Sequence, residues 1–174
     1  MDHASDLSWV VIADAGPLIA LSRVQCLPLL RDLFGSVTIT EQIRSETLDH
    51  GHFPGQEAIA DALQAGWLSS HPVDLAGWQA RLPGVDEGEA SALCLAAQFT
   101  HALLIIDDRV GRAEARDRGL SIMGVAAVIG LARRQGLVPL ASPILHALRA
   151  KGYYIGDEVI AAVLASVGET ASGD

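Results

Sequence analysis

Apolar residues recur along this chain in two alternating patterns. Short runs of β-branched and aliphatic residues, each ended by charged or turn residues, are typical of strands that are buried in a parallel sheet. Between these runs, apolar positions recur every three or four residues, which is the spacing of helices with one buried face. The runs predict five strands, at Trp9–Ala13, Val37–Thr40, Trp67–Val73, Ala102–Ile106 and Leu120–Met123.

The segments between and after the strands are expected to be helical. The predicted helices are Leu18–Ser22, Leu27–Phe34, Glu41–Leu48, Gln56–Ala65, Asp74–Leu82, Asp86–Phe99, Val110–Arg118, Val125–Gln135, Pro143–Lys151 and Gly156–Val167. Strands that alternate with helices predict an α/β fold with a mostly parallel sheet, right-handed crossovers and helices on both faces. In such sheets, the active crevice lies beyond the carboxyl ends of the strands.

Length and composition narrow the class of protein. A chain of 174 residues, half of them apolar, is long enough for one core and too short for two ordinary domains. We therefore expect a single domain over residues 1–168 and a disordered tail over residues 169–174. No apolar run approaches the ~20 residues that cross a bilayer, and residues 1–8 lack the pattern of a secretory signal. The sequence therefore predicts a cytoplasmic protein with no membrane contact.

The net charge of −9 gives the protein no overall attraction to nucleic acid. Any contact with RNA therefore requires a local basic patch and a bound metal ion. Eight of the 12 basic residues fall between positions 101 and 151, a window with only four acidic residues. These eight are Arg109, Arg112, Arg116, Arg118, Arg133, Arg134, Arg149 and Lys151. This segment is the predicted RNA-facing part of the chain.

Acidic residues stand where the predicted strands end and the helices begin. Asp14 ends the first strand, and Asp107 and Asp108 end the fourth. Glu46 lies about two turns into the helix after the second strand, and Glu89 lies in the first turn of the helix that opens at Asp86. Carboxylates brought together in one crevice repel each other unless protons or a cation neutralise them. Hard oxygen ligands without thiolates or paired histidines favour Mg²⁺ or Mn²⁺.

Each of these acids also has an ordinary structural interpretation. Asp86 and Glu89 fit a capping box, in which each side chain bonds to the other residue's backbone. Asp14, and one of Asp107 and Asp108, could cap the helices that follow them. Glu46 could be a solvated charge. The order along the chain favours a shared site, because a set of caps has no reason to produce strand-Asp, helix-Glu, helix-Glu, strand-Asp-Asp.

These motifs resemble the PIN domain. The similarity is carried by Val-Ile-Ala-Asp14-Ala-Gly-Pro-Leu-Ile, Val-Thr-Ile-Thr-Glu-Gln-Ile-Arg-Ser-Glu46, Asp86-Glu-Gly-Glu89-Ala and Leu-Leu-Ile-Ile-Asp107-Asp108-Arg-Val-Gly-Arg112. The resemblance implies a three-layer α/β/α fold and Mg²⁺- or Mn²⁺-dependent endoribonuclease chemistry. It also implies frequent homodimers and, often, the role of a VapC-type toxin with an antitoxin partner. The catalytic acids would be Asp14, Glu46, Glu89, Asp107 and Asp108, with Asp14, Glu89 and Asp107 or Asp108 holding the metal.

Two departures from the PIN pattern leave alternatives open. Gly16 stands where many PIN domains have Ser or Thr, and Ile106 precedes Asp107 where many have Thr or Ser. The sequence does not decide between Asp107 and Asp108, and a non-catalytic module that binds RNA or a protein partner stays an alternative to the nuclease. Gly16 also argues against aspartyl phosphotransfer, because haloacid-dehalogenase-like enzymes have a second Asp there. Arg109 and Arg112 are the candidate phosphate contacts beside the crevice.

Overall fold

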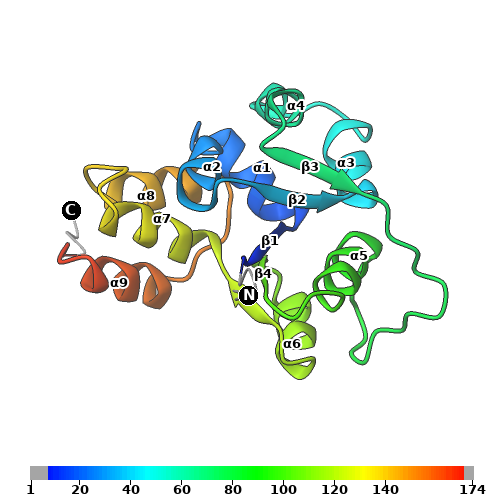
Figure 1. Ribbon diagram of the computed structural model, residues 1–174. Coiled ribbons are helices and arrows are strands. Elements are labelled where there is room, and N and C mark those ends of the chain that lie inside the picture. Colours follow the sequence, from blue (N-terminus) through cyan, green and yellow to red (C-terminus); the bar gives the residue numbers. More distant parts are fainter. Residues whose placement is uncertain (1–7, 171–174) are drawn as a thin grey trace, which may run out of the picture.

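A computed structural model describes residues 8–170, and its centre is a five-stranded sheet in which every pair of neighbours is parallel (Figure 1). The strand order is β3-β2-β1-β4-β5. The strands are β1 Val10–Ala13, β2 Val37–Thr40, β3 Leu68–His71, β4 Ala102–Ile105 and β5 Ser121–Met123. All five predicted strands are therefore present, and the predicted α/β class is confirmed.

Nine helices in the described residues complete a three-layer α/β/α arrangement. Figure 1 shows α5 and α6 on one side of the sheet, and α2 and α7 on the other. The helices are α1 Ala15–Arg23, α2 Pro28–Phe34, α3 Glu41–Leu48, α4 Gln56–Ala65, α5 Glu87–Ala96, α6 Arg109–Asp117, α7 Val125–Arg134, α8 Ser142–Ala150 and α9 Asp157–Ser166. None of them is long and apolar enough to cross a membrane.

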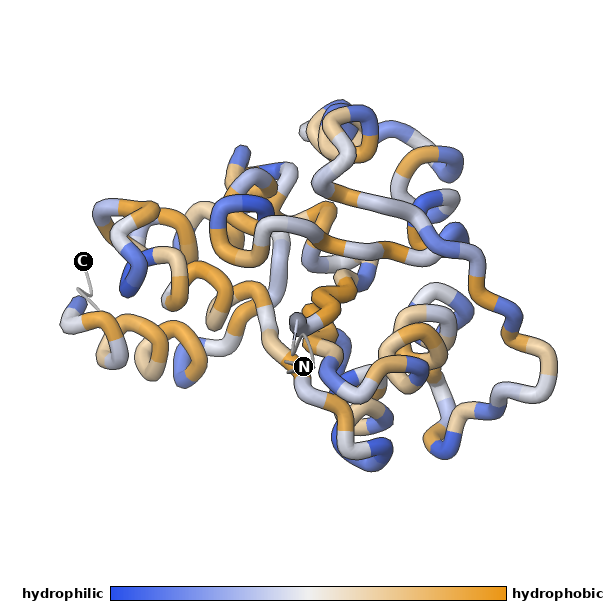
Figure 2. The backbone as a smooth tube through the Cα atoms, in the orientation of Figure 1, coloured by the Kyte–Doolittle hydropathy of each residue, from blue (hydrophilic) through white to orange (hydrophobic). Residues whose placement is uncertain are grey.

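The central strands carry the core. Ile12 and Ala13 of β1 are fully buried, as are Leu104 and Ile105 of β4. Figure 2 shows these strands as apolar segments in the middle of the molecule. Continuous burial explains why the sequence shows unbroken apolar runs here rather than alternation, because helices cover both faces of the sheet.

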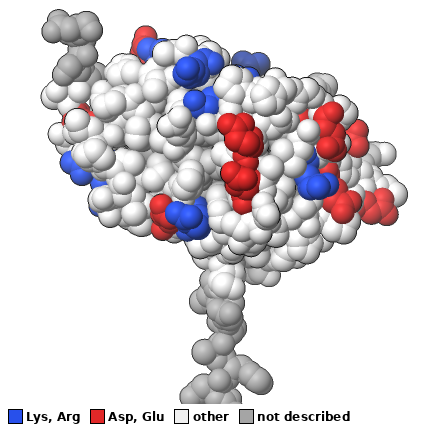
Figure 3. Space-filling model, turned by 90° about the horizontal axis from the view of Figure 1, so that it is seen from above, with Lys and Arg blue, Asp and Glu red and all other residues white. Residues whose placement is uncertain are grey.

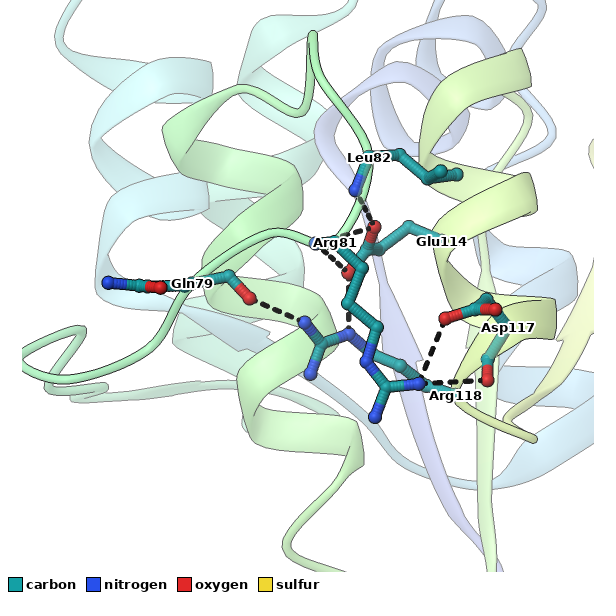
Figure 4. Close-up of polar contacts among 6 residues, drawn as sticks. All are labelled: Gln79, Arg81, Leu82, Glu114, Asp117 and Arg118. Atoms are coloured by element: carbon teal, nitrogen blue, oxygen red, sulfur yellow. Dashed lines mark hydrogen bonds and ion pairs between the residues drawn. The ribbon is translucent and has the colours of Figure 1, made fainter.

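The predicted helix over Asp74–Leu82 is wrong. This segment is an irregular loop, and Gly77 within it has a φ of 78°, in the left-handed region that favours glycine. The N–H groups of Arg81 and Leu82 donate to the Glu114 carboxylate at 2.8–3.1 Å instead of to carbonyls within a helix (Figure 4). Because a partner on α6 satisfies these donors, the loop needs no helical hydrogen bonds.

Glu169, the first residue of the segment expected to be disordered, contacts the rest of the domain. It accepts hydrogen bonds from the backbone N–H groups of Ala141 and Ser142, and it pairs with Arg133 at 3.2 Å. These contacts hold Glu169 against the start of α8. Residues 171–174 of the expected tail lie outside the described residues.

The sheet places the two aspartate segments side by side. β1 pairs with β4 along its whole length, from Val10 with Ala102 to Ala13 with Ile105. The Asp14 backbone N–H then donates to the Ile105 carbonyl at 2.9 Å. Since both strands run in the same direction, Asp14 and Asp107 leave the sheet at the same edge, where α5 and α6 begin.

Candidate active site: an acidic pocket at the carboxyl edge of the sheet

The structure brings all five predicted acids into one pocket of about 680 Å³. Both candidate phosphate contacts, Arg109 and Arg112, also line it. The complete lining is Asp14, Gly16, Pro17, Glu46, Asp86, Glu89, Asp107, Asp108, Arg109, Arg112, Tyr153 and Tyr154. Six carboxylates and two guanidinium groups therefore share one pocket.

Asp14 occupies the position before α1 and is only 7% exposed. Its backbone is extended, as at an N-cap, but its side chain makes no capping hydrogen bond. The capping interpretation of Asp14 is therefore wrong. Burial raises the pKa of Asp14 to about 7, and the nearby charges of Asp86, Glu46 and Asp108 add to this rise.

Asp86 and Glu89 form the capping box that the sequence allows. The Glu89 N–H donates to Asp86 Oδ1 at 2.8 Å, and the Asp86 N–H donates to Glu89 Oε2 at 3.1 Å. This structural role does not remove Glu89 from the pocket. Its side chain is buried, and burial raises the pKa of Glu89 to about 7, with further rises from Asp86, Asp108 and Asp14.

Asp86 is a member of the acidic group that sequence reasoning left out. Its charge raises the pKa of Asp14, Glu46 and Glu89. Its position in a capping box explains the omission, because a cap at a helix start gives the same local signal as a site residue. Only the position of Asp86 on the pocket wall, beside Asp14, distinguishes a site residue from a residue that merely caps a helix.

Glu46 reaches the pocket from α3 through the space beside Gly88. A Cβ atom at Gly88 would lie 2.6 Å from Glu46 Oε2, so a larger residue there would push this carboxylate away from the first turn of α5. Burial and the Asp86 charge raise the pKa of Glu46, while His50 opposes the rise.

The structure separates Asp107 from Asp108. Asp108 caps α6, with Oδ1 accepting from the N–H groups of Val110 and Gly111 at 2.7 and 2.9 Å. Its charge acts on both Asp14 and Glu89. Asp107 instead faces the C-terminal part of the chain. Its Oδ2 accepts from the Val125 N–H at 2.8 Å and from the Tyr153 hydroxyl at 2.6 Å.

Tyr153 connects the C-terminal helices to the pocket, and nothing in the sequence pattern pointed to it. Burial, the Asp107 charge and the hydrogen bond to Asp107 all raise the pKa of Tyr153, so its hydroxyl remains a donor. Arg112 makes a similar connection, because its Nη1 donates to the Ile106 carbonyl at 2.9 Å. Tyr153 and Arg112 thus hold the segment that follows β4 from two sides.

The predicted basic patch is more dispersed than expected. Arg118, Arg133 and Arg149 pair with Glu114, Glu169 and Asp157, respectively, outside the pocket lining. Of the eight predicted residues, only Arg109 and Arg112 line the pocket. On the face that Figure 3 shows, basic side chains stand in small separate groups among acidic ones.

The donor set suits a hard divalent cation, although the arrangement is open. Within residues 8–170, no three acidic, histidine or cysteine side chains stand close enough to hold one ion between them. Mg²⁺ is commonly held by one or two carboxylates while it keeps several waters. Two buried carboxylates with raised pKa values and four carboxylates nearby provide oxygen ligands and excess negative charge, so the residues fit such an ion.

These features define an α/β protein whose chemistry is carried by carboxylates at the carboxyl edge of a parallel sheet. The chain belongs to the PIN-domain family, since the family model described as DUF3368: PIN domain matches residues 10–169. PIN domains are generally nucleases, which places the chain at a coarse level among the hydrolases. No curated protein and no solved structure matches it significantly.

Proposed function

We propose that this protein is a Mg²⁺- or Mn²⁺-dependent endoribonuclease that cleaves single-stranded RNA in the acidic pocket. The observation that carries the proposal is the pair of buried carboxylates, Asp14 and Glu89, each with a pKa raised to about 7. At neutral pH, such a pair is poised between protonation and cation binding.

A divalent cation in the pocket would supply charge neutralisation for a scissile phosphate and a more acidic water as nucleophile. Asp14 and Glu89 are the buried residues that would hold the ion, with Asp108 beside them. Asp107 is a weaker candidate because its charge, unlike that of Asp108, is not among those that raise the pKa of Asp14 and Glu89. Arg109, at the start of α6, would neutralise phosphate oxygens where the RNA enters.

Cleavage assays on a mixed single-stranded RNA pool test the proposal. Wild type should cut RNA with Mg²⁺ or Mn²⁺ and not with EDTA, and Asp14→Asn and Glu89→Gln should each lose roughly 100-fold or more. Gln at position 89 can still accept the Asp86 N–H bond, so the capping box is kept. Asp61→Asn and Glu57→Gln, which change exposed acids of α4, are matched controls.

Thermal melts of each variant separate loss of chemistry from loss of fold. If wild type cuts nothing in a broad pool with either metal, or if Asp14→Asn and Glu89→Gln cut as well as the controls, the nuclease proposal is wrong.

A non-catalytic module that binds RNA or a protein partner is the second candidate. It is favoured by the lack of three ligands close together in residues 8–170, and by the structural hydrogen bonds that Glu89, Asp107 and Asp108 already make. This candidate predicts RNA or partner binding that survives EDTA, whereas the nuclease requires metal for turnover.

The biological setting is proposed on the family resemblance alone. The protein would act in the cytoplasm as a homodimer, possessing an antitoxin partner if it is the toxin of a toxin–antitoxin pair. A small neighbouring gene that encodes a DNA-binding fold, and whose product binds this protein and blocks RNA cleavage, would support the toxin role.

A further inference from the structure

Tyr154 is the most exposed large hydrophobic side chain described, at 90%, and it lies on the wall of the acidic pocket. Large aromatic side chains are usually at least partly buried, because they contribute much apolar area to a core. An aromatic ring that faces solvent beside six carboxylates and two arginines is a candidate contact for a bound ligand.

The backbone on both sides of Tyr154 is fixed. The Tyr153 hydroxyl donates to Asp107 at 2.6 Å, and Ile155 is buried with its carbonyl held by Arg149 Nη2 at 2.7 Å. The exposure of Tyr154 is therefore not explained by a loop that lacks contacts with the rest of the domain. The chain presents this ring while it anchors both neighbours.

A second hollow, of about 260 Å³, also has Tyr154 in its wall. Its wall is formed mainly by small apolar residues of α7 and α9, and it shares Asp107, Arg112 and Tyr154 with the acidic pocket. Apolar lining is contributed by Ala126, Ala127, Val159 and Val163. The two hollows are therefore neighbours along one surface, with Tyr154 between them.

Resting on the proposed function, we infer that Tyr154 and this apolar hollow bind a nucleobase of the RNA next to the phosphate in the acidic pocket. A nucleobase presents a flat π-face to the ring and a small apolar body to the alanine and valine side chains. The nearby Arg112 lies where the two hollows meet, on the path of the connecting sugar and phosphate.

A base-binding site would add affinity for RNA that the net charge of the protein does not provide. With a net charge of −9 and only two arginines in the pocket lining, electrostatic attraction alone gives RNA little affinity. Stacking on an aromatic ring works for every base and does not depend on the net charge of the protein. The tyrosine would therefore select single-stranded nucleic acid, because a paired and stacked base cannot reach the ring.

Binding of a fluorescein-labelled single-stranded RNA tests the inference, with Ca²⁺ in place of Mg²⁺ and the RNA checked for integrity on a gel. Tyr154→Ala should weaken binding roughly tenfold or more, because base stacking contributes on that order for each base. Tyr154→Phe should bind like wild type, since the ring and not the hydroxyl makes the contact. Ala127→Leu should also weaken binding by filling the hollow from the exposed face of α7.

Trp9→Ala is the matched control. Trp9 is 54% exposed and precedes β1, at the opposite end of the strand from Asp14, so its loss should leave RNA binding unchanged. An RNA analogue that lacks bases gives a second check. Wild type should prefer the intact RNA, and Tyr154→Ala should lose most of that preference. In Mg²⁺ turnover, Tyr154→Ala should raise KM and leave kcat within about twofold.

The outcomes separate this inference from the proposed function. If wild type cuts and binds RNA but Tyr154→Ala binds equally well, the base site is wrong and the nuclease proposal stands. If wild type neither cuts nor binds, both fail. If Tyr154→Ala changes the molecular mass in light scattering and leaves RNA affinity unchanged, the ring contacts a second copy of the chain, which also overturns the base site.

Discussion

The carboxylates buried within residues 8–170 lie in two regions. Donors surround the carboxylate in one region, and further acids surround the carboxylates in the other. Glu114 of α6 is fully buried and is surrounded by donors: the Arg118 guanidinium at 2.7 Å and the backbone N–H groups of Arg81 and Leu82 (Figure 4). Asp14 and Glu89 are almost as buried, yet their near neighbours include further acids. The same type of side chain at a similar depth thus lies among donors in one region and among further acids in the other.

The pKa directions express this difference. Burial alone would raise the pKa of Glu114, but its hydrogen bonds and the Arg118 charge outweigh burial and lower it. At Asp14 and Glu89, burial and the neighbouring acids act in the same direction, and both pKa values rise to about 7. The chain can therefore surround a buried acid with donors, which makes the pair that lies among further acids a candidate for cation binding.

The Glu114 cluster has a clear structural task. It fixes the irregular loop between β3 and α5 onto α6, and Arg118 also lies over the Trp78 ring, with its Cζ 4.6 Å from the ring centroid. This loop leads directly into Asp86 and the capping box of α5. Glu114 thus holds the loop that leads to Asp86 and Glu89, two of the carboxylates in the acidic pocket.

The largest effect on stability is expected from Glu114→Gln. The amide keeps one acceptor oxygen but places an NH₂ group against donors, so either Arg118, which bonds to Oε1, or the Leu82 N–H, which bonds to Oε2, loses its partner. Breaking a buried, hydrogen-bonded ion pair from one side costs about 3 kcal/mol or more. Urea unfolding measures this loss, and Glu57→Gln on the surface of α4 is the control. A change in the free energy of unfolding as small as that of the control would show that the cluster does not stabilise the fold.

The second effect is a pH dependence of opposite sign in the two regions. The raised pKa values of Asp14 and Glu89 mean that the folded protein binds more protons than the unfolded chain between about pH 4 and pH 7. Their contribution is fully present below the unfolded pKa and is lost as the pH rises through 7. The lowered pKa of Glu114 acts the other way, since its contribution is present above 4.5 and is lost as the pH falls.

In EDTA, the wild-type protein should therefore be less stable at pH 8 than at pH 5.5, and Asp14→Asn should remove a large part of that difference. A shift of the Asp14 pKa from 3.8 to about 7 corresponds to about 4 kcal/mol over the whole pH range, at about 1.4 kcal/mol per unit, and about 2 kcal/mol of this is lost between pH 5.5 and pH 8. Mg²⁺ should restore stability at pH 8 in wild type more than in Asp14→Asn, while Asp61→Asn behaves like wild type. Greater stability of the metal-free wild type at pH 8 would contradict this assignment.

The comparison also explains which parts of the molecule could be predicted from the sequence. Most residues of the strands β1 and β4 are buried, so their apolar runs carry a strong local signal. The Asp74–Leu82 segment was predicted wrongly because its N–H partners belong to Glu114, more than 30 residues away. Local propensity contains no information about that contact.

The site residues also divide into those that could be predicted from the sequence and those that could not. Asp14, Glu46 and Glu89 were predicted to share a crevice because the carboxyl ends of parallel strands and the starts of the following helices must meet at one edge. Tyr153 and Tyr154 were missed because only the packing of the C-terminal helices brings them to the pocket. The division of roles between Asp107 and Asp108 depends on the same long-range contacts, through Val125 and Tyr153.

The smallest effect is expected from Gly16→Ser, which adds a hydroxyl group to the acidic pocket. Gly16 lies in the first turn of α1, lines the pocket and has no positive φ, and a Cβ atom there would meet nothing within 4 Å. Serine should therefore fit without strain and stabilise the helix by about 0.5 kcal/mol relative to glycine.

The serine hydroxyl, two residues after Asp14, can hydrogen bond to a carboxylate or to water around the ion. Because such supporting contacts commonly change metal affinity by 10-fold or more, we expect Mn²⁺ to bind roughly threefold to tenfold more tightly by titration calorimetry. Gly16→Ala favours the helix by about 1 kcal/mol without adding a hydroxyl, so the difference in Mn²⁺ affinity between the two variants isolates the oxygen. Equal Mn²⁺ affinity of the serine and alanine variants would mean that the missing hydroxyl does not limit metal binding in this pocket.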